Sequence, residues 1–399
     1  MSMFAATIFL PAETHAEEVA VKPIETAIDA PELTEVSVKN RIKKVKISKE
    51  RKKIELLAPN NSADIPITSS MKELAVSTED SGGTLLLSDS PEYVKENGIL
   101  YTDVVKGDAR ILFYHLNNSY GNKKVAIVLE NLTNRMNKIE ISRGGVASPS
   151  GDFLKVGKEV QMKYFNQPLN DTLYILGKTT KLLRDEMDEI VLQPGELIYG
   201  VYDFHTTQEV RVSVLFYPAT AKPLLYYKRA PIQAADEYHL RGTFKGMNRT
   251  IKSKRAYDPE KDGTVYFQIG DDVNDKYKKG YDAIDGVEVT NFGNYGILYT
   301  LDLPTKKETQ FYLCPLGGVY AGAMRTKSHP RSDLRDPYSK LILTPDGKKF
   351  FGDMIPTDSE ALNQFELSDL GKYKGDLYFE YSPPGASNLP VNIILQPAQ

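Results

Sequence analysis

The densest group of potential metal ligands lies between residues 270 and 286. Its candidate ligands are Asp271, Asp272, Asn274 and Asp275. Closely spaced carboxylate and amide oxygens on a loop are the ligands that calcium prefers. The spacing departs from the EF-hand pattern, because the sixth position counted from Asp272 is Tyr277 and not glycine. Three lysines in the same stretch also offset its negative charge, so the sequence favours a solvated loop, with calcium binding as the alternative.

The histidines and the single cysteine give little support for metal or nucleophile chemistry. The chain has five histidines, and none forms an HxH or HxxxH pair, so a zinc or copper site would need ligands from distant segments. His115 and His205 both fall at predicted strand ends, where hydrogen-bonded structural histidines are expected. Cys314 lies in an apolar run and is expected to be a buried thiol, which leaves the chain without an internal disulfide.

Known catalytic signatures are missing from the sequence. No GxSxG elbow, P-loop or GxGxxG occurs. The stretch "GGVASPSGD", residues 144–152, has the composition of a phosphate loop, but we expect a β-turn because neither a following helix nor a Walker lysine is predicted. Any chain with 53 acidic residues contains pairs that could serve a glycosidase, so their presence does not discriminate. We predict no catalytic residue.

Sugar binding by aromatic side chains is the other candidate chemistry. Tyrosines near predicted turns could stack on sugars; they are Tyr226, Tyr227, Tyr295, Tyr320 and Tyr338. The chain contains no tryptophan, the largest stacking surface, and most tyrosines of β-sandwiches pack at the edge of the core. We single out Tyr295 as a ligand-contact candidate, because it lies at the tip of a predicted turn.

A basic segment precedes the predicted folded part. Residues 39–53 carry nine basic residues against Glu50 alone, among them Lys43, Lys44, Lys46, Lys49, Arg51, Lys52 and Lys53. Such runs are usually solvated linkers, and the alternative is contact with a polyanion such as a wall polymer, lipid head groups or nucleic acid. The net charge of -3 and the lack of interleaved aromatic residues argue against specific nucleic-acid binding.

The N-terminal residues 1–16 resemble a signal peptide. An apolar run precedes the small-residue site Thr14-His15-Ala16, although the basic n-region is missing. This predicts secretion, with an apolar tail on a cytosolic protein as the alternative. No later stretch is long and apolar enough for a transmembrane helix.

The remaining chain is predicted to be all-β, as two tandem β-sandwiches of Ig-like or jelly-roll-like type. Strand patterns occur at residues 109–116, 125–129, 138–141 and 210–214, separated by turn residues. The best helix candidate is the segment 179–190, expected to be a short addition to the strands. The expected division is a signal-like segment (1–16), a disordered linker (17–74) and two domains (75–225 and 226–399).

Two comparisons within the chain favour that division, with chance similarity between two β-segments as the alternative. Residues 196–218 align without a gap with residues 375–397, and both are interpreted as strand, loop and closing strand. In "VEVTNFGNYGILYTL", residues 287–301, Asn291 to Gly296 is predicted to be the turn of a hairpin, because Asn and Gly tolerate positive φ. Asn131 occupies the matching place in the first half.

Three segments resemble parts of uncharacterised exported β-sandwich proteins of Gram-positive bacteria. They are "VTNFGNYGILYTLDL", "CPLGGVYAGAM" and "YFEYSPPGASNLPVNIILQP". Some of those proteins carry a module similar to the copper amine oxidase N-terminal domain, which is not seen here. The resemblance covers roughly residues 95–399, implies an exported, surface-associated protein and supplies no catalytic residue.

The leading hypothesis is therefore an exported, non-catalytic binding or structural protein of a bacterial surface, with a cell-wall polymer or glycan as partner and no cofactor apart from the calcium alternative. The rival is a secreted hydrolase of glycans or peptides, with its site in a cleft between the two halves. A third hypothesis is a subunit of a larger assembly, paired through an edge strand.

Overall fold

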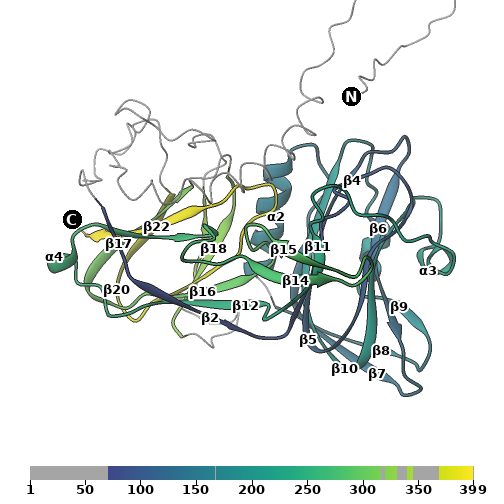
Figure 1. The fold of residues 1–399 in the computed structure, drawn as a ribbon, viewed down its shortest axis with the longest axis horizontal. Helices are drawn as coiled ribbons and strands as arrows, with labels where there is room; N and C mark the ends of the chain where they lie inside the picture. The colour runs from purple at the N-terminus through teal and green to yellow at the C-terminus, as the bar shows by residue number, and fades with distance from the viewer. Residues whose placement is uncertain (1–70, 167, 316–319, 330–338, 345–367, 399) are drawn as a thin grey trace, which may run out of the picture.

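A computed structural model describes residues 71–166, 168–315, 320–329, 339–344 and 368–398. Within these residues most of the chain is strand, arranged in three sheets (Figure 1). The all-β prediction is confirmed. The signal-like segment 1–16 and the linker up to residue 70, with its basic run, lie outside the described residues. The last residues of the predicted linker are ordered instead, because Lys72–Glu73 form a short strand and Leu74 belongs to the larger core.

The largest sheet has eleven strands in the order β15-β14-β11-β3-β5-β10-β6-β9, with β4, β7 and β8 joined beside this path. Its strands are β3 (Thr84–Ser88), β4 (Tyr93–Val94), β5 (Gly98–Asn117), β6 (Lys123–Asn131), β7 (Asn137–Val146), β8 (Pro168–Ile175), β9 (Thr180–Leu182), β10 (Leu197–Pro218), β11 (Arg241–Lys245), β14 (Lys278–Asp282) and β15 (Val287–Asn291). All four strand patterns predicted before residue 225 fall within these strands.

The long strand β10 pairs with β5 on one side and with two successive strands on the other. β10 pairs with β5 along nearly its whole length, from Leu197 opposite Leu116 to Phe216 opposite Gly98. On its other side, the first part of β10 pairs with β7 and the part from Val210 pairs with β6. A register shift between Thr206 and Val210 marks the change, as expected of a bulge that bends a strand.

The other two sheets take strands from both ends of the described chain. The five-stranded sheet contains β1 (Lys72–Glu73), β13 (Val265–Ile269), β22 (Val391–Pro397), β17 (Thr305–Pro315) and β20 (Ser368–Gly375). The six-stranded sheet contains β19 (Leu341–Leu343), β18 (Ala323–Lys327), β21 (Tyr378–Tyr381), β16 (Leu298–Asp302), β12 (Asn248–Ser253) and β2 (Val76–Ser81).

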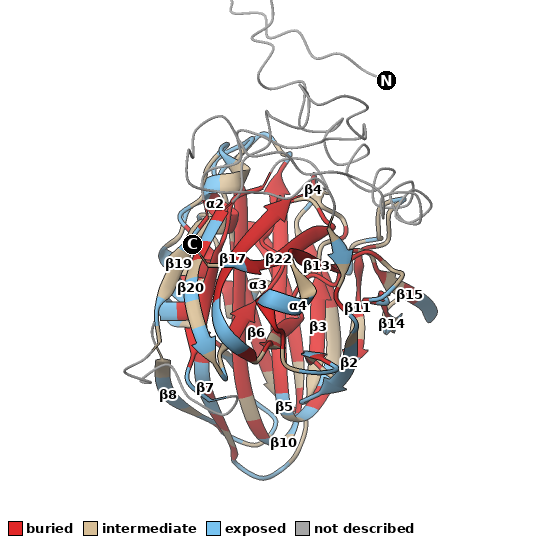
Figure 2. Cartoon of the chain, turned by 90° about the vertical axis from the view of Figure 1, so that its left-hand side faces the viewer, coloured by how far each residue is buried: buried red, intermediate tan, exposed pale blue. Residues whose placement is uncertain are grey.

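The boundary expected near residue 225 does not coincide with a boundary between sheets. β2 lies beside β12, whereas β11, β14 and β15 belong to the sheet of β3 and β5. The larger hydrophobic core likewise combines Tyr114 and Val160 with Phe267, Leu301 and Ile393. Figure 2 shows this buried interior running through β13, β17 and β22 as well as β3, β5 and β6.

The principal helix is α2 (Phe153–Asn166), which lies between the eleven-stranded and six-stranded sheets (Figure 1). Val156, Val160 and Tyr164 repeat at helical spacing and pack into the larger core. The helix predicted for residues 179–190 is wrong: that segment forms β9 and the 3₁₀ turn η3 (Asp185–Glu189). Two short helices, α3 (Pro223–Tyr227) and α4 (Pro259–Asp262), complete the described elements.

The hairpin predicted for residues 287–301 is also wrong. β15 pairs with β14, whereas β16 pairs with β12 and β21, so residues 292–297 cross from one sheet to another. The turn residues were correctly identified, since Gly293, Asn294 and Gly296 have φ of 88°, 55° and 80°. The partners of β16 are strands far away in the sequence, which a local pattern does not predict.

The two segments aligned as a repeat have different structures. Residues 197–218 form the single strand β10. Residues 375–397 contain β21 and β22, which belong to different sheets. Similar alternation of apolar residues therefore supports two arrangements, depending on which strands lie alongside.

Candidate functional site

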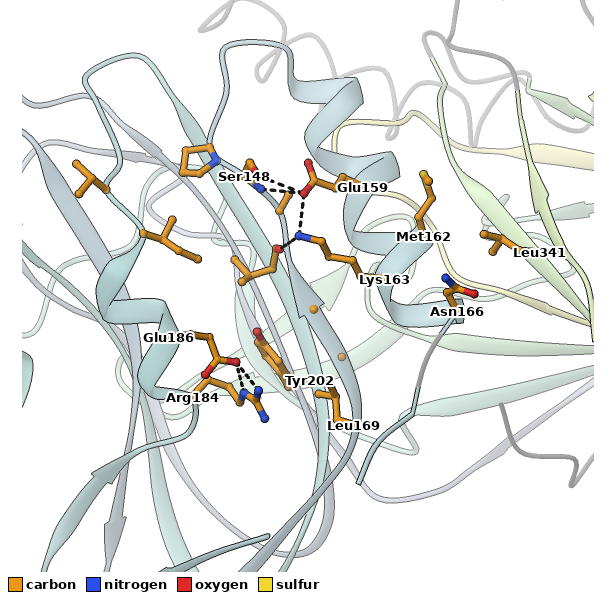
Figure 3. A pocket seen from close by; sticks show the side chains of 17 residues that line it. Ser148, Glu159, Met162, Lys163, Asn166, Leu169, Arg184, Glu186, Tyr202 and Leu341 are labelled. Atoms are coloured by element: carbon orange, nitrogen blue, oxygen red, sulfur yellow. Dashed lines mark hydrogen bonds and ion pairs between the residues drawn. The ribbon is translucent and has the colours of Figure 1, made fainter. Parts of the chain in front are cut away.

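A groove of about 770 Å³ lies between α2 and the segment around η3 (Figure 3). Its floor is the end of β7 with Tyr202 of β10. Its lining residues are Gly144, Gly145, Val146, Ala147, Ser148, Pro149, Glu159, Met162, Lys163, Asn166, Leu169, Arg184, Glu186, Ile190, Val191, Tyr202 and Leu341.

Two glycines let the floor of the groove lie close to neighbouring groups. A Cβ at Gly144 would lie 2.4 Å from the Tyr202 ring and 2.5 Å from the Val201 oxygen, and its φ is 151°. A Cβ at Gly145 would meet the Lys163 side chain at 2.6 Å. Burial, together with the charge of Glu186, raises the pKa of Tyr202, so its phenol is neutral at pH 7.

The α2 wall carries a paired charge. Glu159 and Lys163 are one turn apart and lie 2.8 Å from each other. Lys163 Nζ also donates to the Val146 oxygen at 2.8 Å, while the Ser148 backbone N–H and hydroxyl donate to Glu159. Partial burial opposes ionisation of Glu159, but Lys163 and Ser148 hold its pKa below the usual value.

The opposite wall repeats this arrangement. Arg184, just before η3, forms ion pairs with Glu186 and with Asp171 of β8. Next to them Ile190 and Val191 provide an apolar lip, and the Val191 side chain is 42% exposed. In Figure 3 the two charged pairs occupy opposite sides of the groove.

The groove therefore combines apolar side chains with charges that neutralise one another. Its four charged lining residues form two ion pairs, and its serine, Ser148, donates to Glu159, whose charge is already neutralised by Lys163. Such a surface suits a neutral ligand that has both apolar faces and hydrogen-bonding groups.

The residues chosen for calcium are engaged in protein contacts. Asp271 is 1% exposed and accepts the backbone N–H groups of Val273, Asn274 and Asp275. Asp275, also 1% exposed, lies 2.5 Å from Arg249 and accepts the Tyr299 hydroxyl at 2.7 Å.

The other two members of that set are similarly used. Asp272 accepts the Tyr277 backbone N–H, and the Asn274 amide donates to Glu73. These side chains stabilise their own loop, so the solvated loop predicted for residues 270–286 is instead partly buried.

Tyr295 is not at an exposed tip. Its side chain is buried, and its hydroxyl donates to the Ser387 oxygen at 2.6 Å. The segment around it crosses between sheets, which places the tyrosine in the larger core. Lys43, Lys44, Lys46, Lys49, Arg51, Lys52 and Lys53 lie outside the described residues.

His115 and His205 each hydrogen-bond to other residues, as the sequence predicted. Burial lowers the pKa of His115 to about 4, and its ring bonds Ser88 and the Pro91 oxygen. His205 pairs with Asp108 at 2.7 Å on the surface. Cys314 is buried, as expected, and burial raises its pKa well above the usual value.

One group of potential metal ligands combines two aspartates of the 270–286 stretch with His239, which the sequence did not predict. His239, Asp282 and Asp285 place their ligand atoms within 4.8 Å of one another. Arg241, which is fully buried, occupies the same two carboxylates at 2.8 and 2.9 Å. The buried guanidinium supplies the positive charge that these aspartates would otherwise offer to an ion.

The groove itself was also missed, because it depends on α2. A periodicity signal was present in "FLKVGKEVQMKYFN", where Val156, Val160 and Tyr164 repeat at every fourth position. The sequence predicted no helix after residues 144–152, but α2 follows them directly.

No protein-family model matches this chain, and no curated protein matches its sequence. Among the described residues, no helix is long and apolar enough to cross a membrane.

Proposed function

We propose that the protein is a non-catalytic binding protein of a bacterial surface, and that the groove between α2 and η3 holds a neutral polymer such as a glycan chain of the cell wall. The observation that carries this proposal is the pairing of all four charged groove residues with groups of the protein. A ligand that brings its own charge would have to break one of these pairs, whereas a neutral polar chain would not.

The hydrolase alternative receives less support from the groove. Hydrolysis needs a nucleophile or water activated by a nearby base. Among the described lining residues, Glu159 is held by Lys163 and Ser148, and the Tyr202 phenol is neutral. The histidine–carboxylate pairs His205–Asp108 and His239–Asp282 lie outside the groove lining.

Export and attachment rest on the sequence. Residues 1–16 predict export, and the basic run 39–53 predicts a salt-sensitive contact with an anionic wall polymer. The shared sheets favour one continuous folded unit over the two tandem sandwiches that the sequence predicted.

A wall co-sedimentation assay tests the groove. We expect Val191→Trp to weaken binding to isolated, teichoic-acid-free cell walls by about tenfold, because the larger ring fills the lip of the groove. Val104→Trp is the matched control, since Val104 is 39% exposed and does not line the groove. Equal binding by both variants would contradict the groove assignment.

The same assay distinguishes binding by the basic segment from binding by the groove. Deleting residues 39–53 should remove the salt-sensitive part of binding to walls that retain teichoic acid, and leave binding to the stripped walls unchanged. If the deletion abolishes binding to both wall types, the groove is not the binding site.

A further inference from the structure

The tip of the β7–β8 ribbon, at the end of β7 remote from the groove, exposes a group of apolar side chains. Leu176 is 65% exposed, Met136 57% and Tyr174 48%. The other face of the ribbon is buried, since Ile139 and Ile175 belong to the second hydrophobic core. The ribbon lies at the lower right of Figure 1.

The exposed side chains share one face. Asn137 is opposite Ile175, and Lys138 is opposite Tyr174. Extending this register by one residue places Met136 opposite Leu176, and alternation along the strands puts both on the face of Lys138 and Tyr174. The next pair on the same face is Glu140 with Thr172.

Hydrogen bonds join the two loops that form the tip. The buried Asn131 amide donates to the oxygens of Arg135 and Ile175, which ties the β6–β7 loop to the end of β8. The Lys178 backbone N–H donates to the Thr133 oxygen at 3.0 Å across the same two loops.

Along this face the side chains become more polar with distance from the tip, and successive cross-strand pairs on the face are roughly 7 Å apart. Leu176 and Met136 come first, followed by Tyr174 with Lys138, and only then by the acidic Glu140. Arg135 and Lys178 add exposed cations at the tip, whereas Lys138 is paired with Glu140 and the adjoining β10 turn carries Glu209. This order is expected of a surface that enters a lipid interface: the apolar residues are outermost, tyrosine and lysine come next, and the acidic residue is last.

We propose that this tip docks onto an anionic lipid surface, with Leu176 and Met136 in the acyl boundary and Arg135 and Lys178 at the head groups. The charge excess at the tip favours anionic lipid over a neutral membrane. Docking is peripheral and leaves the groove, at the other end of β7, open. The proposal does not depend on what the groove binds.

Vesicle flotation of the full chain tests this. We expect flotation with phosphatidylcholine vesicles that contain phosphatidylglycerol, and at least about tenfold weaker binding to phosphatidylcholine alone. The double variant Met136→Asp/Leu176→Asp should lose flotation. Tyr120→Asp is the matched control, because Tyr120 is 92% exposed but precedes β6 at the end of that strand remote from the tip.

To distinguish lipid binding by the tip from lipid binding by the basic run, a variant that lacks residues 39–53 is tested in the same flotation assay. Retained flotation of this deletion, and loss in the double variant, supports docking by the tip. Absence of flotation with either vesicle, flotation unchanged in the double variant, or loss in Tyr120→Asp as well would each overturn the proposal. Circular dichroism of each variant confirms that the fold is retained.

Discussion

Glu380 of β21 lies where three cations meet in the interior. Its carboxylate lies 2.8 Å from Arg143 of β7, 3.2 Å from Arg325 and 3.0 Å from Lys327 of β18. The Arg143 guanidinium also lies 4.2 Å from the centre of the Tyr164 ring of α2. One buried carboxylate therefore connects the eleven-stranded sheet, the six-stranded sheet and the helix.

Replacing this carboxylate with an amide is expected to destabilise the protein strongly. Glu380→Gln leaves buried cations without their counter-charge, which typically costs about 3–5 kcal/mol in the free energy of unfolding. Urea denaturation measures the change. Glu140→Gln, which breaks the exposed pair with Lys138, is the control and should leave the midpoint unchanged.

The same residue predicts an acid dependence. Burial by itself would raise the pKa of Glu380, but Arg143, Lys327 and Arg325 lower it from 4.5 to about 2. Because the folded protein holds this carboxylate deprotonated more strongly than the unfolded chain does, its contribution is complete above pH 4.5 and is lost as the pH falls through 2. The unfolding free energy of Glu380→Gln should fall less steeply than that of the wild type across this window, and parallel curves would exclude the effect.

At the scale of the elements, a recurring asparagine turn closes several strands. Asn117, Asn131 and Asn291 are buried at strand ends, and each amide donates to the backbone oxygen four residues later. The matching places of Asn131 and Asn291 in the sequence thus reflect a shared turn. The elements that each turn joins nevertheless differ, because β7 returns to the sheet of β6 whereas β16 enters another sheet.

The packing of α2 predicts a further effect at this scale. A Cβ on Gly157 would lie 2.0 Å from the Gly385 oxygen, so the helix approaches this backbone more closely than any side chain allows. We expect Gly157→Ala to destabilise the protein by about 2 kcal/mol, although alanine favours helix by about 1 kcal/mol.

Thermal unfolding measures that effect, with Gly121→Ala as control because a Cβ there meets no atom within 4 Å. A stabilised Gly157→Ala variant would show that the close approach is not maintained in solution.

At the scale of the whole molecule, the chain behaves structurally as one unit across residue 225. All three sheets and the larger core contain residues from both sides of that position. Cooperative unfolding is expected of a shared core. Calorimetry of the full chain should therefore give one transition whose van't Hoff and calorimetric enthalpies agree, and fragments 71–225 and 226–399 should not fold separately. Two resolved transitions would restore the two-domain interpretation.

Much of the local character of this protein follows from its sequence. Alternating apolar residues predicted strands in β5, β6, β7 and β10, because period-two alternation is a property of one segment. The Asn–Gly composition after Asn291 predicted a turn with positive φ for the same local reason. The apolar run around Cys314 likewise predicted a buried thiol.

Only the tertiary structure decided which distant segments pair or pack together. β16 has the same local character whether it returns to β15 or crosses to β12 and β21, and the difference comes from burial of its side chains against strands far away in the sequence. The same reason applies to the groove and the ribbon tip. Glu159 and Arg184 lie on opposite sides of the groove, and Met136 lies opposite Leu176 because β7 pairs with β8. Both arrangements join segments that are separate in the sequence, so the residue spacing within one segment does not predict them.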